Sequence, residues 1–104
     1  MNVIALKYLD KYIRKSRDAA VQLRAWHHET DSAEWADSTD IKNRYASASF
    51  LEDNIVVFNI KGNHYRLVVK VDYARGIVRI KWFGTHARYT AELKQKKNLR
   101  FQDY

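Results

Sequence analysis

The chain has 104 residues, of which 46% are hydrophobic and 30% charged, which predicts one globular domain and excludes a disordered segment. It has no cysteine, which excludes disulfides, thiolate catalysis and thiolate metal sites. The net charge is +7, and it is unevenly placed: residues 61–104 hold 11 Lys/Arg and 3 Asp/Glu, whereas residues 1–60 hold 8 and 9. A basic half with interleaved aromatic side chains favours a nucleic-acid partner, although an acidic protein would also fit.

The start of the chain predicts a short strand and a helix. Residues 1–5 are short and apolar, as in an edge strand. In residues 6–15 the apolar side chains Leu6, Leu9 and Ile13 recur at helical spacing in an otherwise polar segment. We expect an amphipathic helix that packs on a sheet.

Two further helices are expected before the strands begin. Ser16 is a plausible N-cap for a helix over residues 17–29, because its hydroxyl can accept a backbone hydrogen bond of the first turn. Ser38 or Thr39 can cap a short third helix that ends near residue 45 in the same way.

Three apolar runs rich in Val, Ile and aromatics predict strands at residues 55–60, 65–72 and 77–83. Gly62-Asn63 suits a two-residue hairpin loop, and the turn before the last strand closes on Gly76, which suits a positive φ. A C-terminal helix is expected over residues 87–97. Helices followed by strands indicate an α+β fold, with N-terminal helices packed on one face of a small antiparallel sheet.

Alternation of side chains separates a core face from a second face of this sheet. The core face is expected to hold the apolar side chains Val56, Phe58, Ile60, Tyr65, Leu67, Val69, Val71, Val78, Ile80 and Trp82. The second face is expected to place Lys70 opposite Arg79, with Arg66 and Lys81 nearby and Phe83 beside Arg66. Opposed like charges destabilise a sheet. The cluster is therefore either a solvated face with Lys and Arg stems over apolar neighbours, or an anion site for a phosphate backbone.

The remaining signals concern membranes, metals and proton transfer. No run approaches a membrane span and the N-terminus lacks the apolar core of a signal peptide, so we expect a cytoplasmic protein with no membrane partner. His27 and His28 point about 100° apart on a helix, which is poor geometry for a shared metal. We expect no metal and no cofactor. His86 follows the last strand and can titrate near neutral pH, which suits proton transfer.

The stretch from residue 56 to residue 89 resembles the C-terminal half of the HigB family of toxins, which belongs to the RelE-like superfamily of toxin–antitoxin modules. The resemblance rests on NI-x-GN-x-YRLVV, GIV-x-I and GTHA-x-Y, and upstream on LRAWHHE, WADSTDIKNRY and SASFL. It covers nearly the whole chain, residues 1–104, as one RelE-like toxin domain. It implies an endoribonuclease that cuts mRNA on translating ribosomes and is silenced, in a hetero-oligomer, by a helix-turn-helix antitoxin of the HigA type.

The resemblance also implies site residues. The family's basic sheet positions match Arg66, Arg79 and Lys81, and its His and Tyr after the last strand match His86 and Tyr89. The family's tail reads T-H-x-E-Y-D, where this chain reads T-H-A-R-Y-T. Its two acidic positions are therefore taken by Arg88 and Thr90.

These side chains suit RNA cleavage by the RNA's own 2′-hydroxyl, which needs a base, an acid and cations on the phosphate but no metal. Among the catalytic candidates, Arg79 would clamp phosphate together with Arg66, whereas Lys81 and His86 compete for the base and acid roles. Tyr89, the fourth catalytic candidate, or Phe83 would stack a base. The remaining RNA-binding candidates are Lys70 and Arg88.

Two other functions remain open at this point. The first is a non-nuclease inhibitor on the same scaffold, like the gyrase-poisoning ParE relatives. The second is a nucleic-acid-binding protein that has lost catalysis, which Arg88 and Thr90 would favour.

Overall fold

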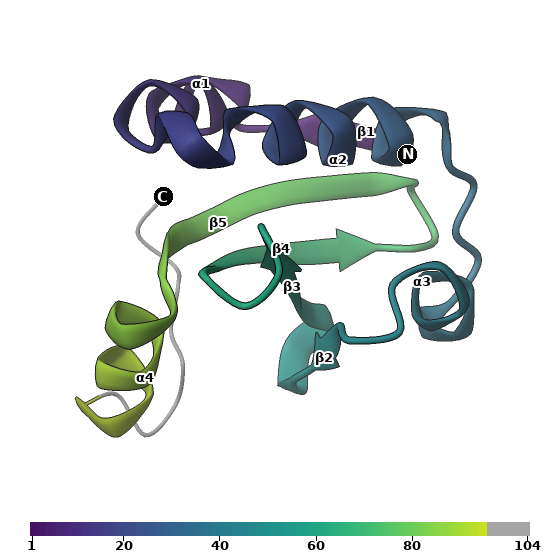
Figure 1. The fold of residues 1–104 in the computed structure, drawn as a ribbon. Helices are drawn as coiled ribbons and strands as arrows, with labels where there is room; N and C mark the ends of the chain where they lie inside the picture. The colour runs from purple at the N-terminus through teal and green to yellow at the C-terminus, as the bar shows by residue number, and fades with distance from the viewer. Residues whose placement is uncertain (96–104) are drawn as a thin grey trace.

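The computed structural model describes the backbone of residues 1–95 and the side chains of residues 1–92. Five strands form one sheet in the order β1-β5-β4-β3-β2. Their bounds are β1 Asn2–Ile4, β2 Ser49–Phe50, β3 Ile55–Ile60, β4 Tyr65–Asp72 and β5 Ile77–Thr85. β1 runs parallel to β5, and the other neighbouring strands are antiparallel. The α+β architecture expected from the sequence is confirmed (Figure 1).

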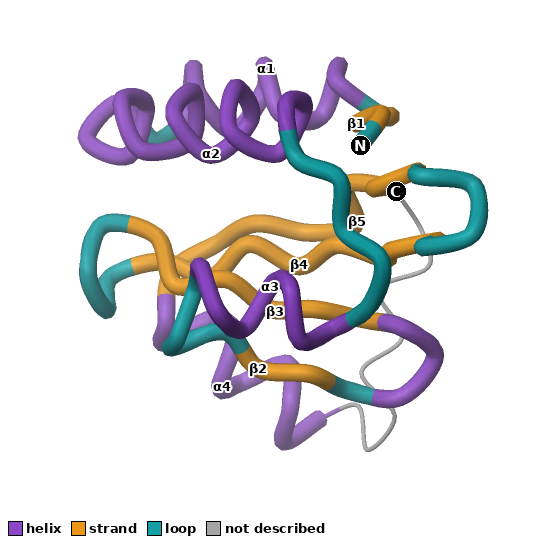
Figure 2. Tube along the Cα trace, turned by 90° about the vertical axis from the view of Figure 1, so that its right-hand side faces the viewer, coloured by secondary structure: helices purple, strands orange, loops and turns teal. Residues whose placement is uncertain are grey.

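Four α-helices accompany the sheet within the described residues: α1 Leu6–Lys15, α2 Ala20–Ser32, α3 Ser38–Arg44 and α4 His86–Gln95. Helices α1 and α2 lie on one side of the sheet and α4 lies on the other side (Figure 2). Leu9 and Tyr12 of α1 and Leu23 and Trp26 of α2 are buried against the core face. The N-terminal helices thus cover one face, as predicted.

Helices α1 and α3 lie close to their predicted bounds, whereas α2 begins and ends three residues later than predicted. Residues 96–97 of the predicted C-terminal helix lie outside the described residues. The predicted caps are wrong. Ser16 makes no side-chain capping bond, because the chain passes through a 3₁₀ turn, Arg17–Ala19, before α2 begins. The cap of α3 is Asp37, whose carboxylate accepts a hydrogen bond from the backbone N of Thr39 at 2.9 Å. A carboxylate one residue earlier therefore caps this helix in place of Ser38 or Thr39.

The β3–β4 hairpin has the predicted register, with Ile60 opposite Tyr65. Positive φ angles fall on Lys61 (52°) and Gly62 (62°) in its turn. Gly76 also has a positive φ, of 67°, as predicted for the turn between β4 and β5.

The β4–β5 pairing departs from the prediction halfway along. Lys70 lies opposite Arg79 and Val69 opposite Ile80, as expected, but the next pair is Val68 with Trp82, so a β-bulge makes Lys81 an extra residue of β5. An extra residue on one strand reverses the faces of the residues beyond it. Trp82 therefore lies on the second face and Phe83 on the core face, the opposite of what was predicted.

Aromatic side chains organise the core. Phe58 lies at its centre, with the rings of Tyr45, Trp26 and Trp35 at centroid distances of 5.0, 5.5 and 6.3 Å. Offset and edge-on ring packing of this kind adds stability beyond the area buried. It also anchors α2 and α3 to β3.

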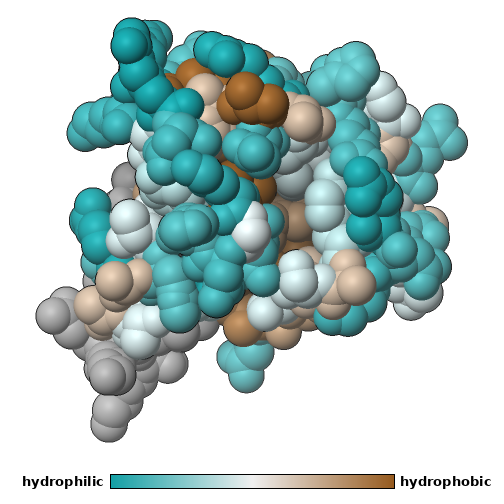
Figure 3. Space-filling view, in the orientation of Figure 1, coloured by the Kyte–Doolittle hydropathy of each residue, from teal (hydrophilic) through white to brown (hydrophobic). Residues whose placement is uncertain are grey.

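The face of the molecule that Figure 3 shows is mostly hydrophilic, with a narrow apolar band through its middle. The large exposed apolar side chains are Leu6, Val21 and Phe50. No helix among residues 1–95 has the length and hydropathy that crossing a bilayer requires.

Candidate functional site

The second face of the sheet has three rows of side chains that run across β3, β4 and β5. The first row contains Asn59, Arg66 and Gly84, the second Val57, Val68 and Trp82, and the third Ile55, Lys70 and Arg79. The middle row is buried and apolar. The first and third rows are four residues apart on β4, so Arg66 and Lys70 are separated by about 13 Å along the strand. The cations predicted as one cluster thus form two groups on either side of an apolar centre.

Arg66 is held by the turn that precedes it. Its guanidinium donates to the carbonyl oxygens of Asn63 at 3.2 Å and Tyr65 at 3.1 Å, and to the side-chain oxygen of Asn63 at 2.8 Å. The fork of an Arg side chain loses much of its freedom in such a network. Arg66 is therefore preorganised at one end of the second face.

The same turn holds the start of α4. The backbone N of His86 donates to the carbonyl oxygen of His64 at 2.9 Å. Thr85 caps the helix, because its hydroxyl accepts a hydrogen bond from the backbone N of Arg88 at 3.2 Å. Thr90 donates its hydroxyl to the carbonyl oxygen of His86 at 3.0 Å. His86 is exposed beside Arg66's end of the sheet.

Tyr89 connects α4 to the apolar centre. Its ring packs against Trp82 with a centroid distance of 6.2 Å and an interplanar angle of 48°. Burial raises the pKa of the Tyr89 phenol above its usual value, and the nearby charge of Arg66 offsets part of that shift. The phenol is therefore protonated at neutral pH and can donate a hydrogen bond. Arg66, His86 and Tyr89 form one group, which we call the turn-end group.

The other cations lie further along the sheet. Lys70 and Arg79 are exposed and directly opposed, while Lys81 lies at the bulge next to Trp82. Asp72, at the end of β4, accepts a hydrogen bond from the backbone N of Arg75 at 3.0 Å and is 3.7 Å from its guanidinium. Lys70 and Arg79 form no ion pair with another described residue.

Phe83 and Arg88 lie outside both groups of cations on the second face. Phe83 was expected on the second face, but it is only 6% exposed and stacks on Tyr65 at 5.1 Å and 14° within the core. The bulge at Lys81 causes this, so Phe83 has no surface on which to stack a base. Arg88 is exposed on α4.

Sequence reasoning missed several features of this end of the molecule. Asp18, from the 3₁₀ turn before α2, accepts hydrogen bonds from the Tyr65 hydroxyl at 2.7 Å and the Lys61 ammonium at 3.1 Å. An interaction over 47 residues leaves no local pattern in the sequence. Within the described residues, no group of three His, Asp or Glu side chains could hold a metal ion.

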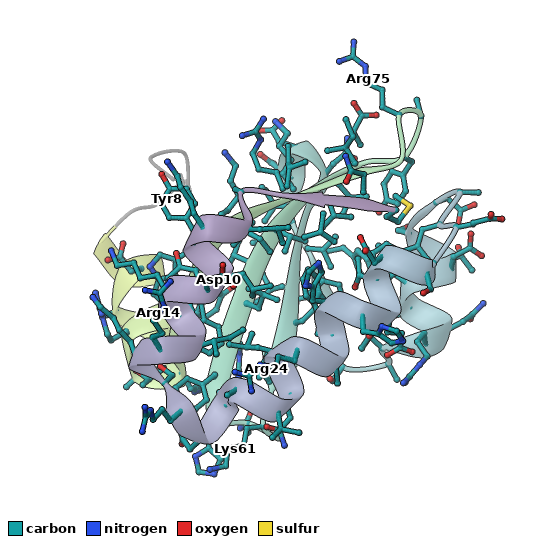
Figure 4. All side chains as sticks on the ribbon, turned by 90° about the horizontal axis from the view of Figure 1, so that it is seen from above. Tyr8, Asp10, Arg14, Arg24, Lys61 and Arg75 are labelled. Carbon is teal, nitrogen blue, oxygen red and sulfur yellow. The ribbon has the colours of Figure 1, made fainter. Side chains whose placement is uncertain are left out.

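A second cationic surface lies on the helical layer. It consists of the exposed side chains Lys7, Lys11, Arg14, Lys15, Arg17 and Arg24, and we call it the helix cations. None of them forms an ion pair with another described residue. Figure 4 looks onto this layer, with Arg14 on α1, Arg24 on α2 and Lys61 at the edge. The sequence signal was present: residues 6–24 hold six Lys/Arg and two Asp/Glu.

A comparison with known families finds a match for most of the chain. The family described as HigB_toxin, RelE-like toxic component of a toxin-antitoxin system, matches residues 19–92 of the chain. The matched span includes the turn-end group, Lys81 and both exposed sheet cations. Among curated proteins, no match is found.

Proposed function

The chain belongs to the HigB toxin family, the RelE-like toxic components of toxin–antitoxin systems, and from that premise we propose that it is an endoribonuclease that cuts mRNA on the ribosome. Membership implies an antitoxin partner. We take that partner to be a helix-turn-helix protein of the HigA type that forms a hetero-oligomer with this chain in the cytoplasm.

The turn-end group is the observation that carries the proposal. It combines a guanidinium held by the β3–β4 turn, an exposed histidine and a phenol that is protonated at neutral pH, near one end of the second face. Fixed cations stabilise the charge that develops on a phosphate in the transition state, and this is often the largest catalytic contribution. Acid–base groups add roughly 10²–10⁴-fold.

The reaction is a transesterification in which the 2′-oxygen of the RNA attacks the adjacent phosphorus and the 5′-oxygen of the next nucleotide leaves. A base takes the 2′-hydroxyl proton and an acid protonates the leaving oxygen, so the products are a 2′,3′-cyclic phosphate and a 5′-hydroxyl. His86 and Lys81 are the candidates for these two proton transfers. Arg66 holds the scissile phosphate, and Tyr89 donates a hydrogen bond to it.

The spacing of the rows revises one assignment. Arg79, proposed from the sequence as catalytic, lies in the row of Lys70, two rows from Arg66. We therefore assign Lys70 and Arg79 to a neighbouring phosphate of the same RNA strand. Two opposed cations cost stability unless an anion lies between them, which favours a binding role.

The helix cations support the ribosome as the partner. Lys7, Lys11 and Lys15 lie at i, i+4 and i+8 on α1, and like charges at this spacing destabilise a helix by roughly 0.2–0.5 kcal/mol per pair. The helical layer and the second face are on opposite sides of the sheet. One mRNA strand bound at the second face does not also cover α1, so a second, structured RNA such as ribosomal RNA fits this surface.

The decisive experiment is to map mRNA 5′ ends after induction and to repeat the cleavage on purified ribosomes with a defined mRNA. We expect 5′-hydroxyl products and no cut where the ribose carries 2′-O-methyl, because the nucleophile is then blocked. Adding EDTA should not change the rate of the chemical step, provided that a control shows that the ribosomes, which need Mg²⁺, stay intact. Intact mRNA beside inhibited gyrase would instead indicate a ParE-like inhibitor, and no growth arrest would indicate a protein that has lost catalysis.

A further inference from the structure

We infer that Asp18 is a positioning residue of this site: from the helical layer it holds the β3–β4 turn, and through that turn it fixes Arg66 and the start of α4. The inference rests on the proposed function and names a residue outside the turn-end group. Asp18 touches neither Arg66 nor His86, so its effect passes through the backbone of the turn.

One carboxylate holds both sides of the turn. Asp18 Oδ1 accepts the hydroxyl of Tyr65 at 2.7 Å, and its Oδ2 accepts the ammonium of Lys61 at 3.1 Å. These two residues flank the turn, whose Lys61 has a positive φ of 52°. A non-glycine residue in this region is strained and persists where surrounding interactions hold it. The Asp18 hydrogen bonds supply such a hold.

The turn passes this constraint to the site. Between Lys61 and Tyr65, Asn63 binds the guanidinium of Arg66 and His64 binds the backbone N of His86. A rotation of the turn would therefore move a phosphate-binding cation and the start of α4 together. Displacements of about 1 Å in a catalytic group can cost on the order of 10²-fold in rate.

The chain contains a matched interaction at the other end of α2. Glu29 accepts the hydroxyl of Tyr45 at 2.7 Å and two hydrogen bonds from the guanidinium of Arg44. This is also a carboxylate that holds a tyrosine and a cation, but it joins α2 to α3 and touches no residue of the site. Comparing the Asp18–Tyr65 and Glu29–Tyr45 hydrogen bonds therefore distinguishes a positioning role in the site from a contribution to fold stability alone.

The test compares Tyr65→Phe with Tyr45→Phe. Both variants lose one hydroxyl and keep the ring, so the stacking of residue 65 on Phe83 is preserved. We expect Tyr65→Phe to lower the single-turnover rate on mRNA-loaded ribosomes about tenfold with little change in KM, because Arg66 acts in the transition state. Tyr45→Phe should lower the melting temperature and leave the rate unchanged. Asp18→Asn should behave like Tyr65→Phe, with partial rescue by Asp18→Glu.

An NMR measurement makes the test independent of catalysis. The side-chain Nε–H signal of Arg66 and the backbone amide of His86 should shift in Tyr65→Phe and stay in place in Tyr45→Phe. If wild type does not cleave mRNA, the proposed function fails, and these signals, with the affinity for a 2′-O-methyl RNA, still decide the inference. Unchanged Arg66 and His86 signals in Tyr65→Phe, or a full cleavage rate in that variant, would overturn it.

Discussion

The indole ring of Trp82 lies directly over Gly84 on the second face. A Cβ atom at position 84 would come within 2.6 Å of Cη2 and 2.8 Å of Cζ2 of Trp82. Gly84 is therefore required for close approach, since its φ is not positive. The indole in this position also provides the surface on which Tyr89 packs. The glycine of the GTHA motif thus determines where the Tyr89 phenol lies.

Gly84→Ala should destabilise the fold by about 1–3 kcal/mol, because the rigid indole must move to admit the methyl group. We also expect lower cleavage activity, because Tyr89 packs on the indole ring of Trp82 and would be displaced with it. Urea unfolding measures the first effect. In a Trp82→Phe background the same substitution should cost much less, because the smaller ring leaves room; equal costs in both backgrounds would contradict the steric explanation.

The helix cations should determine ribosome affinity. Changing Lys7, Lys11 and Lys15 together to Gln should weaken association with ribosomes and lower its salt dependence, by roughly 0.7–0.9 in log–log slope for each phosphate that is no longer neutralised. Sedimentation of the protein with ribosomes at several salt concentrations measures both. The same three positions changed to Arg form the control, which should bind like wild type. Weak binding by the Arg variant would point to a specific role of lysine.

Much of the fold could be predicted from sequence because its signals are local. Helix α1 and the strands β3 and β4 have the predicted bounds, and the core face was correct up to Ile80. The bulge after Ile80 could not be predicted, because Lys81 continues the alternation and fits either register. That one extra residue exchanged Trp82 and Phe83 between faces.

The roles of Arg66, His86 and Tyr89 stay predictions, although the charge of Arg66 does act on the Tyr89 phenol. The hydrogen bonds of Asp18 could not be predicted, because they depend on how the helical layer sits over the hairpin. The helix cations were also missed, because the net charge was summed over residues 1–60, where acidic residues from Glu29 onward cancel the basic residues of the first helices. A charge sum over residues 6–24 alone would have revealed the helix cations.

Thr30→Val should stabilise the protein. Thr30 is fully buried, and its hydroxyl has no hydrogen-bond partner among the described residues. Burying such a group costs roughly 1–3 kcal/mol, and valine has the same shape without it. We expect an increase of about 1 kcal/mol in the free energy of unfolding, measured in urea. A decrease would show that the hydroxyl has a partner in solution, such as a buried water.

Stability should fall in acid partly through Glu29. Burial works to raise the pKa of Glu29, but hydrogen bonds from Tyr45 and Arg44 outweigh it and hold the pKa below its usual value. A carboxyl with a depressed pKa in the folded state adds stability above its unfolded pKa and loses it as pH falls through the folded pKa. Melting temperatures of wild type should therefore decline below about pH 4.5 more steeply than those of Glu29→Gln. Parallel curves would exclude Glu29 as a contributor.

The phenol of Tyr89 should act as a hydrogen-bond donor rather than as a base. Its pKa is raised by burial, so the group stays protonated across the pH range in which ribosomes are active. Tyr89→Phe keeps the ring against Trp82 and removes only the hydroxyl, and we expect it to slow cleavage at least about tenfold. His86→Ala should slow cleavage as strongly, because it removes a candidate acid–base group. Single-turnover cleavage by the two variants measures both effects; full activity in both would move the chemical step away from the turn-end group, towards Lys81 and Arg79.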